Sequence, residues 1–141
     1  MQPFVTLSAS ITWFHVTWAT RHRRRTFKIR GLQRFCERVI HQRCAGRTWR
    51  IVQVCVTPHR VHVLVKADPG VCRRTMLREV RSSVAAAVES SGVARFLSGP
   101  LWDERSWCSA LTGPAQVERI RRALMIRAET CGSGMSVRGD Q

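Results

Sequence analysis

The sequence predicts an α+β domain in which an antiparallel sheet carries two helices on one face. Strand-like and helix-like hydrophobic patterns alternate along the chain in the order β-α-β-β-α-β-α. The second and third strands are separated only by a short break at Pro58, which is typical of a hairpin. With 141 residues, of which 44% are hydrophobic, the chain is long and apolar enough to bury the core of one domain.

The first predicted strand covers residues 11–19, which are rich in Trp, Phe, Val and Thr. Apolar side chains fall on both of its faces, as in a central strand. The basic run at residues 21–25 is expected to form a loop. A helix is predicted over residues 31–44, with Gly46 as its stop, because the apolar side chains of this segment share one face. These apolar residues are Leu32, Phe35, Cys36, Val39 and Ile40.

A hairpin and a second helix follow. Residues 49–56 and 60–66 predict its two strands, and the Asp-Pro-Gly sequence at residues 68–70 predicts a turn. Residues 71–89 predict a helix, because apolar residues recur there at a spacing of four. These residues are Met76, Val80, Val84 and Val88.

The end of the chain predicts a short strand at residues 107–111, a turn, and a third helix at residues 117–129. The Gly- and Ser-containing residues 131–141 are expected to form a flexible C-terminal tail. Residues 1–130 would then be a single domain. The complete order of elements is that of a ferredoxin-like sandwich.

The charge balance favours a polyanionic partner. The chain has 24 basic and 9 acidic residues and a formal net charge of +15. All of the basic residues except Lys28 and Lys66 are arginine, which binds phosphate bidentately and stacks on bases. A GC-rich genome would equally explain arginine in place of lysine, but not the excess of basic over acidic residues.

No apolar run approaches the ~20 residues of a membrane helix, and the N-terminus lacks a signal-peptide pattern. We therefore expect a cytoplasmic protein without membrane contact. The six cysteines contain no Cys-x-x-Cys pair, so we expect reduced thiols and no structural zinc site.

One run of residues bears a family resemblance. The segment at residues 54–65, VCVTPHRVHVLV, is similar to the metal-binding hairpin of the single-tyrosine HUH transposases, which include insertion-sequence and REP-associated transposases. In that family a strand ends at a Met-Pro-Asp turn, and the next strand opens with His-Val-His. Here the turn is Thr-Pro-His, and the second motif reads Arg60-Val61-His62.

The resemblance covers residues 11–128 in the order of the family. Residues 13–20 and 23–27 are similar to its opening strand and basic exit loop. Residues 101–107 resemble its Leu-Trp-x-x-x-aromatic segment before the last strand. Residues 114–122 fall where the tyrosine-bearing helix of the family begins.

The resemblance implies the fold of these transposases and a reaction in which a tyrosine hydroxyl attacks single-stranded DNA and holds the 5′ phosphate covalently. This chain contains no tyrosine, and the family's tyrosine position falls at or next to Ile120. Neither Ser nor Thr occurs between Val117 and Ala128. We therefore expect a degenerate active site at Arg60, His62 and Ile120 that is catalytically inactive.

The metal-binding site implied by the resemblance is also altered. Residues i and i+2 of a strand share a face, so Arg60 stands beside His62 where the family has two histidines. His59 would point away on a regular strand, and only a bulge at the turn would pair it with His62 as a metal ligand. Since a permanent cation repels a divalent ion, we expect no cofactor and propose that Arg60 binds phosphate directly. His62 could equally be a strand histidine packed under a helix.

The features that favour nucleic-acid binding are arginine clusters in the first loop and at two helices. The candidate binding residues are Arg21, Arg23, Arg24, Arg25, Arg60, Arg73, Arg74, Arg119, Arg121 and Arg122. Five tryptophans could stack bases, although tryptophans in strands usually serve the core.

Three functions remain open. The first is a domesticated relative of these transposases that binds single-stranded or hairpin DNA without cutting it. The second is an active nicking enzyme that uses His59 and His62 to hold Mg²⁺ or Mn²⁺, with a relocated nucleophile. The third is an RNA-binding ferredoxin-like module. The family analogy also suggests a homodimer.

Overall fold

The computed structural model describes residues 11–43, 48–91 and 101–140, with their side chains except Arg23 and those beyond Arg127. The secondary structure consists, in chain order, of β1 (Thr12–Thr20), the short 3₁₀ turns η1 (Arg21–Arg23) and η2 (Thr26–Lys28), α2 (Arg30–Arg43), β2 (Trp49–Thr57), β3 (Arg60–Ala67), α3 (Arg73–Ser90), β4 (Trp102–Leu111) and α4 (Pro114–Asp140).

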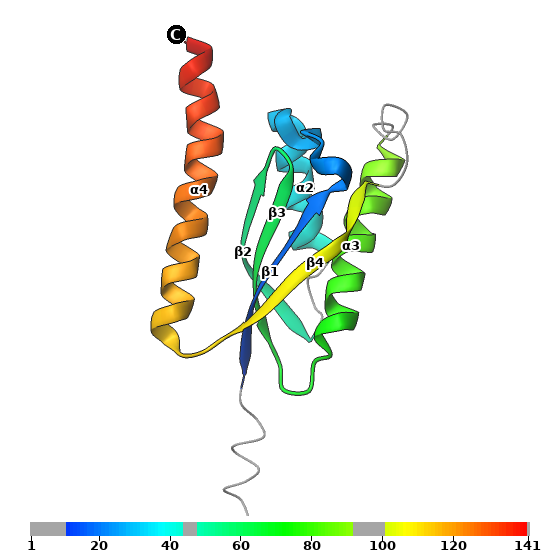
Figure 1. The fold of residues 1–141 in the computed structure, drawn as a ribbon, viewed down its shortest axis with the longest axis vertical. Coiled ribbons are helices and arrows are strands. Elements are labelled where there is room, and N and C mark those ends of the chain that lie inside the picture. Colours follow the sequence, from blue (N-terminus) through cyan, green and yellow to red (C-terminus); the bar gives the residue numbers. More distant parts are fainter. Residues whose placement is uncertain (1–10, 44–47, 92–100, 141) are drawn as a thin grey trace, which may run out of the picture.

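The strands form one antiparallel sheet in the order β2-β3-β1-β4, so β1 and β3 are central and β2 and β4 are edges. Figure 1 shows α2 and α3 on one side of this sheet and α4 on the other. The predicted α+β class, the antiparallel sheet and the β2–β3 hairpin are confirmed. The two helices predicted on one face are α2 and α3, whereas α4 forms a third layer.

The main core lies between the sheet and the pair α2–α3. Along β1, the side chains of Phe14, Val16 and Trp18 alternate into this layer and are buried. Trp18 is fully buried, and its ring meets that of Trp102 edge-on at 5.6 Å between centroids. The apolar faces predicted for the two helices are those that pack here, since Ile40 of α2 and the residues of α3 at a spacing of four are buried.

A smaller core forms on the other face, where α4 crosses β2 and β3. Leu124 of α4 is buried against Cys55 and Leu64, and Val117 and Ile120 pack beside them. The sequence pattern identified the helix but not its position, because Leu124 is the only buried residue that α4 contributes within its described side chains.

Two boundaries differ from the predicted ones. β4 begins at Trp102 rather than at residue 107, because its first half carries charged side chains on a sheet edge and its pairing with β1 shifts register between Trp18 and Thr20. α4 begins at Pro114 and continues to Asp140, whereas a flexible tail was predicted from residue 131. Proline suits the first position of a helix, and no later proline interrupts it. The predicted helix stop at Gly46 lies outside the described residues.

The basic loop after β1 is anchored to the β2–β3 turn. The Thr20 N–H donates to the His59 carbonyl at 3.0 Å, and the Phe27 N–H donates to the Pro58 carbonyl at 2.9 Å. Phe27 is fully buried, with its ring 5.8 Å from that of Trp102. These contacts place the arginine loop beside the start of β3.

No helix in the described ranges is both long and apolar enough to cross a membrane. Among the described cysteines, Cys36 and Cys55 are buried free thiols, Cys72 is exposed and Cys108 is half-buried. Cys44 and Cys131 fall outside the side chains that the structure describes.

Candidate nucleic-acid interface

One row of side chains crosses the sheet on the face opposite α2 and α3. The strand registers pair Cys55 with His62, His62 with Thr17, and Thr17 with Trp107. Directly paired residues in an antiparallel sheet point to the same face, so these four side chains form a continuous line from β2 to β4. Cys55 is covered by α4, whereas Trp107 is 44% exposed.

His62 forms the buried floor of this region. Its Nδ1 atom lies 3.3 Å from Nε2 of His15, and the two rings stack with centroids 5.6 Å apart. On its other side, Nε2 of His62 lies 3.2 Å from Nη1 of Arg127 on α4. The guanidinium is the donor in this contact, which requires that Nε2 of His62 carries no proton.

Burial, and then the positive charge of Arg127, His15 and Arg60, lower the pKa of His62 to about 3. Burial and Arg127 likewise lower the pKa of His15. Both effects disfavour the imidazolium form. His62 is therefore neutral at physiological pH, and the fixed positive charge around it belongs to the two arginines.

Arg60 lies at the start of β3 on the same face as His62. Its Nη1 atom donates to Oγ1 of Thr17 at 3.5 Å, and its guanidinium lies 5.3 Å from the ring centroid of Trp107. Oγ1 of Thr17 in turn donates to the Val61 carbonyl at 2.9 Å. These contacts hold the Arg60 side chain across β1 toward β4.

A divalent cation fits this arrangement poorly. The neighbouring imidazoles of His15 and His62 are two nitrogen donors, but the guanidiniums of Arg60 and Arg127 stand beside them and repel a cation. Within the described part of the chain, no three His, Cys, Asp or Glu side chains come together as a metal site would require. His59, the other candidate ligand, lies in the two-residue turn before β3.

Ile120, the position expected to replace the nucleophile, is half-buried. Its side chain packs with Leu124 of the same helix against Cys55 and Leu64 of the sheet. Arg127, two turns further along α4, is the residue of this helix that contacts His62. The helix thus presents an apolar side chain to the small core and a cation to the histidines.

The candidate arginines do not form a single surface. In the first loop, Arg21 and Arg24 are half-buried and Arg25 is exposed, while the side chain of Arg23 is not described. On α3, both Arg73 and Arg74 are exposed, and Arg73 donates to the Cys108 carbonyl at 3.2 Å with its guanidinium over the Phe14 ring.

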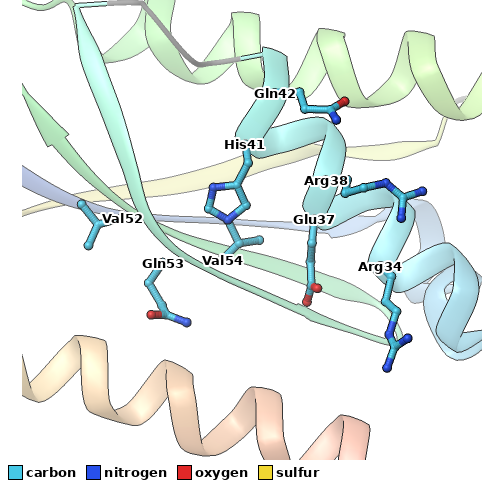
Figure 2. Close-up of a pocket in the computed structure, with 8 residues that line it drawn as sticks. All are labelled: Arg34, Glu37, Arg38, His41, Gln42, Val52, Gln53 and Val54. Atoms are coloured by element: carbon cyan, nitrogen blue, oxygen red, sulfur yellow. The ribbon is translucent and has the colours of Figure 1, made fainter.

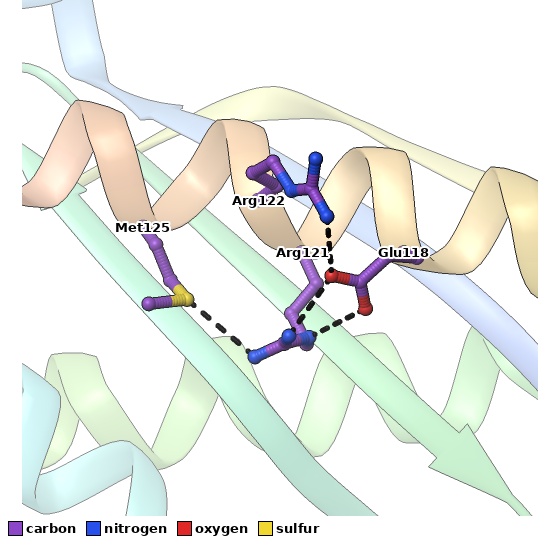
Figure 3. Close-up of polar contacts among 4 residues, drawn as sticks. All are labelled: Glu118, Arg121, Arg122 and Met125. Atoms are coloured by element: carbon purple, nitrogen blue, oxygen red, sulfur yellow. Dashed lines mark hydrogen bonds and ion pairs between the residues drawn. The ribbon is translucent and has the colours of Figure 1, made fainter.

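The arginines of α4 lie on the opposite side of the sheet from those of α3. Arg119 is exposed. Figure 3 shows Arg121 and Arg122 both bonded to Glu118, with Arg121 at 3.0 Å and Arg122 at 3.4 Å from its carboxylate. These hydrogen bonds, chiefly from Arg121, lower the pKa of Glu118. One carboxylate therefore offsets part of the positive charge of this helix.

Two open grooves lie outside the histidine region. Figure 2 shows the larger, of about 780 Å³, between α2 and the edge strand β2, with Arg34, Arg38 and His41 on its helical side. Burial raises the pKa of Glu37 on the same wall. The smaller groove, of about 520 Å³, is lined by Arg21 and seven to eight further residues of η1, α3 and β4, with Trp102 among them.

Sequence reasoning missed the role of His15 and the contact between Arg127 and His62. A signal for His15 was present, because β1 alternates Phe14, Val16 and Trp18 with the more polar series Trp13, His15 and Thr17. The alternation indicates a polar second face. The contact of Arg127 depends on where α4 crosses the sheet, which the sequence pattern does not encode.

The fold resembles those of solved transposase structures. A candidate transposase from Deinococcus radiodurans R1 superposes with a TM-score of 0.67 and 16% identity, covering 84% of this chain and 92% of that one. A REP-associated tyrosine transposase bound to a REP hairpin superposes with a TM-score of 0.62 and 19% identity, covering 84% of this chain and 66% of that one. At these identities the likeness establishes the fold alone.

A search of curated proteins found no match. The family model described as "Transposase IS200 like" matches residues 8–123, which span all four strands, α2, α3 and the start of α4. Given this match over most of its length, together with the shared fold, the chain belongs to the IS200-like transposase family.

Proposed function

We propose that this protein binds single-stranded or hairpin DNA without cutting it, as a catalytically inactive member of its family. The observation that carries the proposal is the pair of guanidiniums around His62. Arg60 and Arg127 place two permanent positive charges where the family resemblance implies a metal ion and a tyrosine. A phosphodiester is the group that such charges attract.

The histidines support this function as neutral groups. Because the pKa of His62 is about 3, its imidazole adds no positive charge at physiological pH. His15 and His62 instead form a stacked, half-buried base on which the guanidinium of Arg127 is held at 3.2 Å from a ring nitrogen. An arginine held in this way loses less conformational entropy when it binds phosphate.

The covalent reaction lacks its nucleophile. The chain contains no tyrosine, and Ile120 packs into the small core beneath α4. The described side chains of this helix before Arg127 include no Ser or Thr that could substitute. A transposase-family fold without a nucleophile, carrying a net charge of +15, retains the binding half of the reaction.

A REP-associated relative is solved with a REP hairpin, and this motivates the choice of DNA over other polyanions. RNA of the same hairpin sequence is the competing ligand. RNA would be discriminated through its 2′-hydroxyl groups and A-form stem.

One pair of gels tests the proposal. A labelled DNA hairpin with unpaired tails is incubated with the protein and Mn²⁺ or Mg²⁺, then divided between native and denaturing electrophoresis. We expect a retarded band on the native gel and only free, full-length DNA on the denaturing gel. A denaturant-resistant adduct or a cleaved product would show that a relocated nucleophile is active. Tighter binding of the matched RNA hairpin would assign the protein to RNA.

A further inference from the structure

Trp107 stands apart from the other tryptophans. Trp18, Trp49 and Trp102 are between 0% and 8% exposed and belong to the main core, and Trp13 is half-buried beside the small core. Trp107 is 44% exposed and lies on β4, at the edge of the sheet. Its indole therefore does not serve either core.

The face on which Trp107 lies is open at this end. α4 packs along β2, and Figure 1 shows it on the side of the sheet away from β4. The neighbouring β4 residue on the same face, Ser109, is exposed, as is Arg105 toward the start of the strand. A planar ligand can therefore approach the indole from solvent without displacing a helix.

The indole is also held in place. Arg60 lies over the ring at 5.3 Å, and the same arginine is bonded to Thr17, the residue directly paired with Trp107 across β1 and β4. A ring fixed by a cation–π contact and a strand backbone is a preorganised stacking surface. The guanidinium adds positive charge at the edge of that surface, which favours a nucleotide with its phosphate over a neutral aromatic molecule.

We propose that Trp107 stacks an unpaired nucleobase whose adjoining phosphate lies near Arg60. The inference rests on the proposed function and narrows it, because it assigns single-stranded DNA to this end of the cleft. A base inside a duplex has neighbours on both of its faces, so only an unpaired base can offer a face to the indole. A paired stem would have to be bound elsewhere on the protein.

The test compares two labelled hairpins with the same stem, one blunt and one carrying unpaired tails at both ends. The wild-type protein should bind the tailed hairpin more tightly. Trp107→Ala should weaken binding of the tailed hairpin by about 5- to 150-fold, the usual range for loss of one stacked base, and change the blunt hairpin little. Trp107→Phe should recover part of the loss. Ile11→Ala, at a residue that is 48% exposed, is the matched control and should have no effect.

A second readout reports stacking itself. 2-Aminopurine is placed in turn at each tail position, and its fluorescence should be quenched at one position by the wild-type protein but not by Trp107→Ala. Equal affinity of the wild type for the two hairpins, or quenching that survives in Trp107→Ala, would overturn the stacking proposal while leaving DNA binding intact. Failure of the wild type to bind either hairpin would overturn both proposals.

Discussion

Acidification should destabilise this protein through His62. The unfolded chain binds a proton at the ordinary histidine pKa of 6.5, whereas the folded protein resists protonation until about pH 3. Because the folded pKa is lowered, the stabilisation is fully present above pH 6.5 and is lost as the pH falls toward 3. The cause is burial of the ring, followed by the charge of Arg127, His15 and Arg60.

The size of the effect follows from the shift. Each pH unit inside this window costs about 1.4 kcal/mol of unfolding free energy, so lowering the pH from 7 to 5 should cost about 2 kcal/mol through His62. His15, whose pKa is lowered in the same direction, adds to the loss. With a urea m-value of about 2 kcal/mol/M, the unfolding midpoint should fall by about 1 M.

The assay is urea unfolding at pH 7 and pH 5, followed by tryptophan fluorescence. His62→Gln removes the titrating ring but keeps an oxygen that can accept a hydrogen bond from Arg127. It should reduce the loss between the two pH values by about 2 kcal/mol. His41→Gln, at an exposed position on α2, is the control and should lose as much stability as the wild type. If His62→Gln lost as much as well, His62 would not be held neutral in the fold.

Three further outcomes are expected. Affinity for hairpin DNA should fall steeply with salt, and replacing the loop Arg23–Arg25 by alanine should make the log–log slope shallower by about 0.7 for each lost single-strand contact; an unchanged slope would remove this loop from the interface. Phe27→Ala should cost about 3–5 kcal/mol in urea unfolding because Phe27 is fully buried, whereas Ile29→Ala, at a residue 66% exposed, should stay within about 0.5 kcal/mol. Arg60→His should increase Mn²⁺ affinity in calorimetry only when combined with Arg127→Gln, since Arg127 contacts His62 at 3.2 Å; equal metal binding by the single and double variants would show that Arg127 does not exclude the ion.

The sequence predicted the fold where one physical signal dominates. β1, the hairpin, α2 and α3 lie within a few residues of their predicted limits, because each buries an apolar face with a clear period. The first half of β4 was missed because Asp103, Glu104 and Arg105 lie on a sheet edge, where water satisfies charged side chains and no alternation is required. The position of α4 was missed because its one buried residue, Leu124, specifies no face of the sheet.

The candidate site divides in the same way. Arg60 and His62 could be placed on one face from their spacing alone, since alternation along a strand is local. The contacts of His62 with His15 and Arg127 bring together residues 47 and 65 positions apart in the chain. They depend on the β1–β3 register and on the crossing of α4, which are tertiary properties. Exposure separated Trp107 from the buried tryptophans, and sequence cannot report exposure on an edge strand.

The central claim is that the former active-site region now binds the DNA backbone through Arg60. The most direct test is fluorescence anisotropy with a tailed DNA hairpin, comparing Arg60→Ala with Arg78→Ala, an exposed arginine of α3 on the other side of the sheet. Loss of a charged phosphate contact should weaken binding by Arg60→Ala about tenfold or more, while Arg78→Ala should bind within about twofold of the wild type. Binding by Arg60→Ala equal to that of the wild type would contradict the claim.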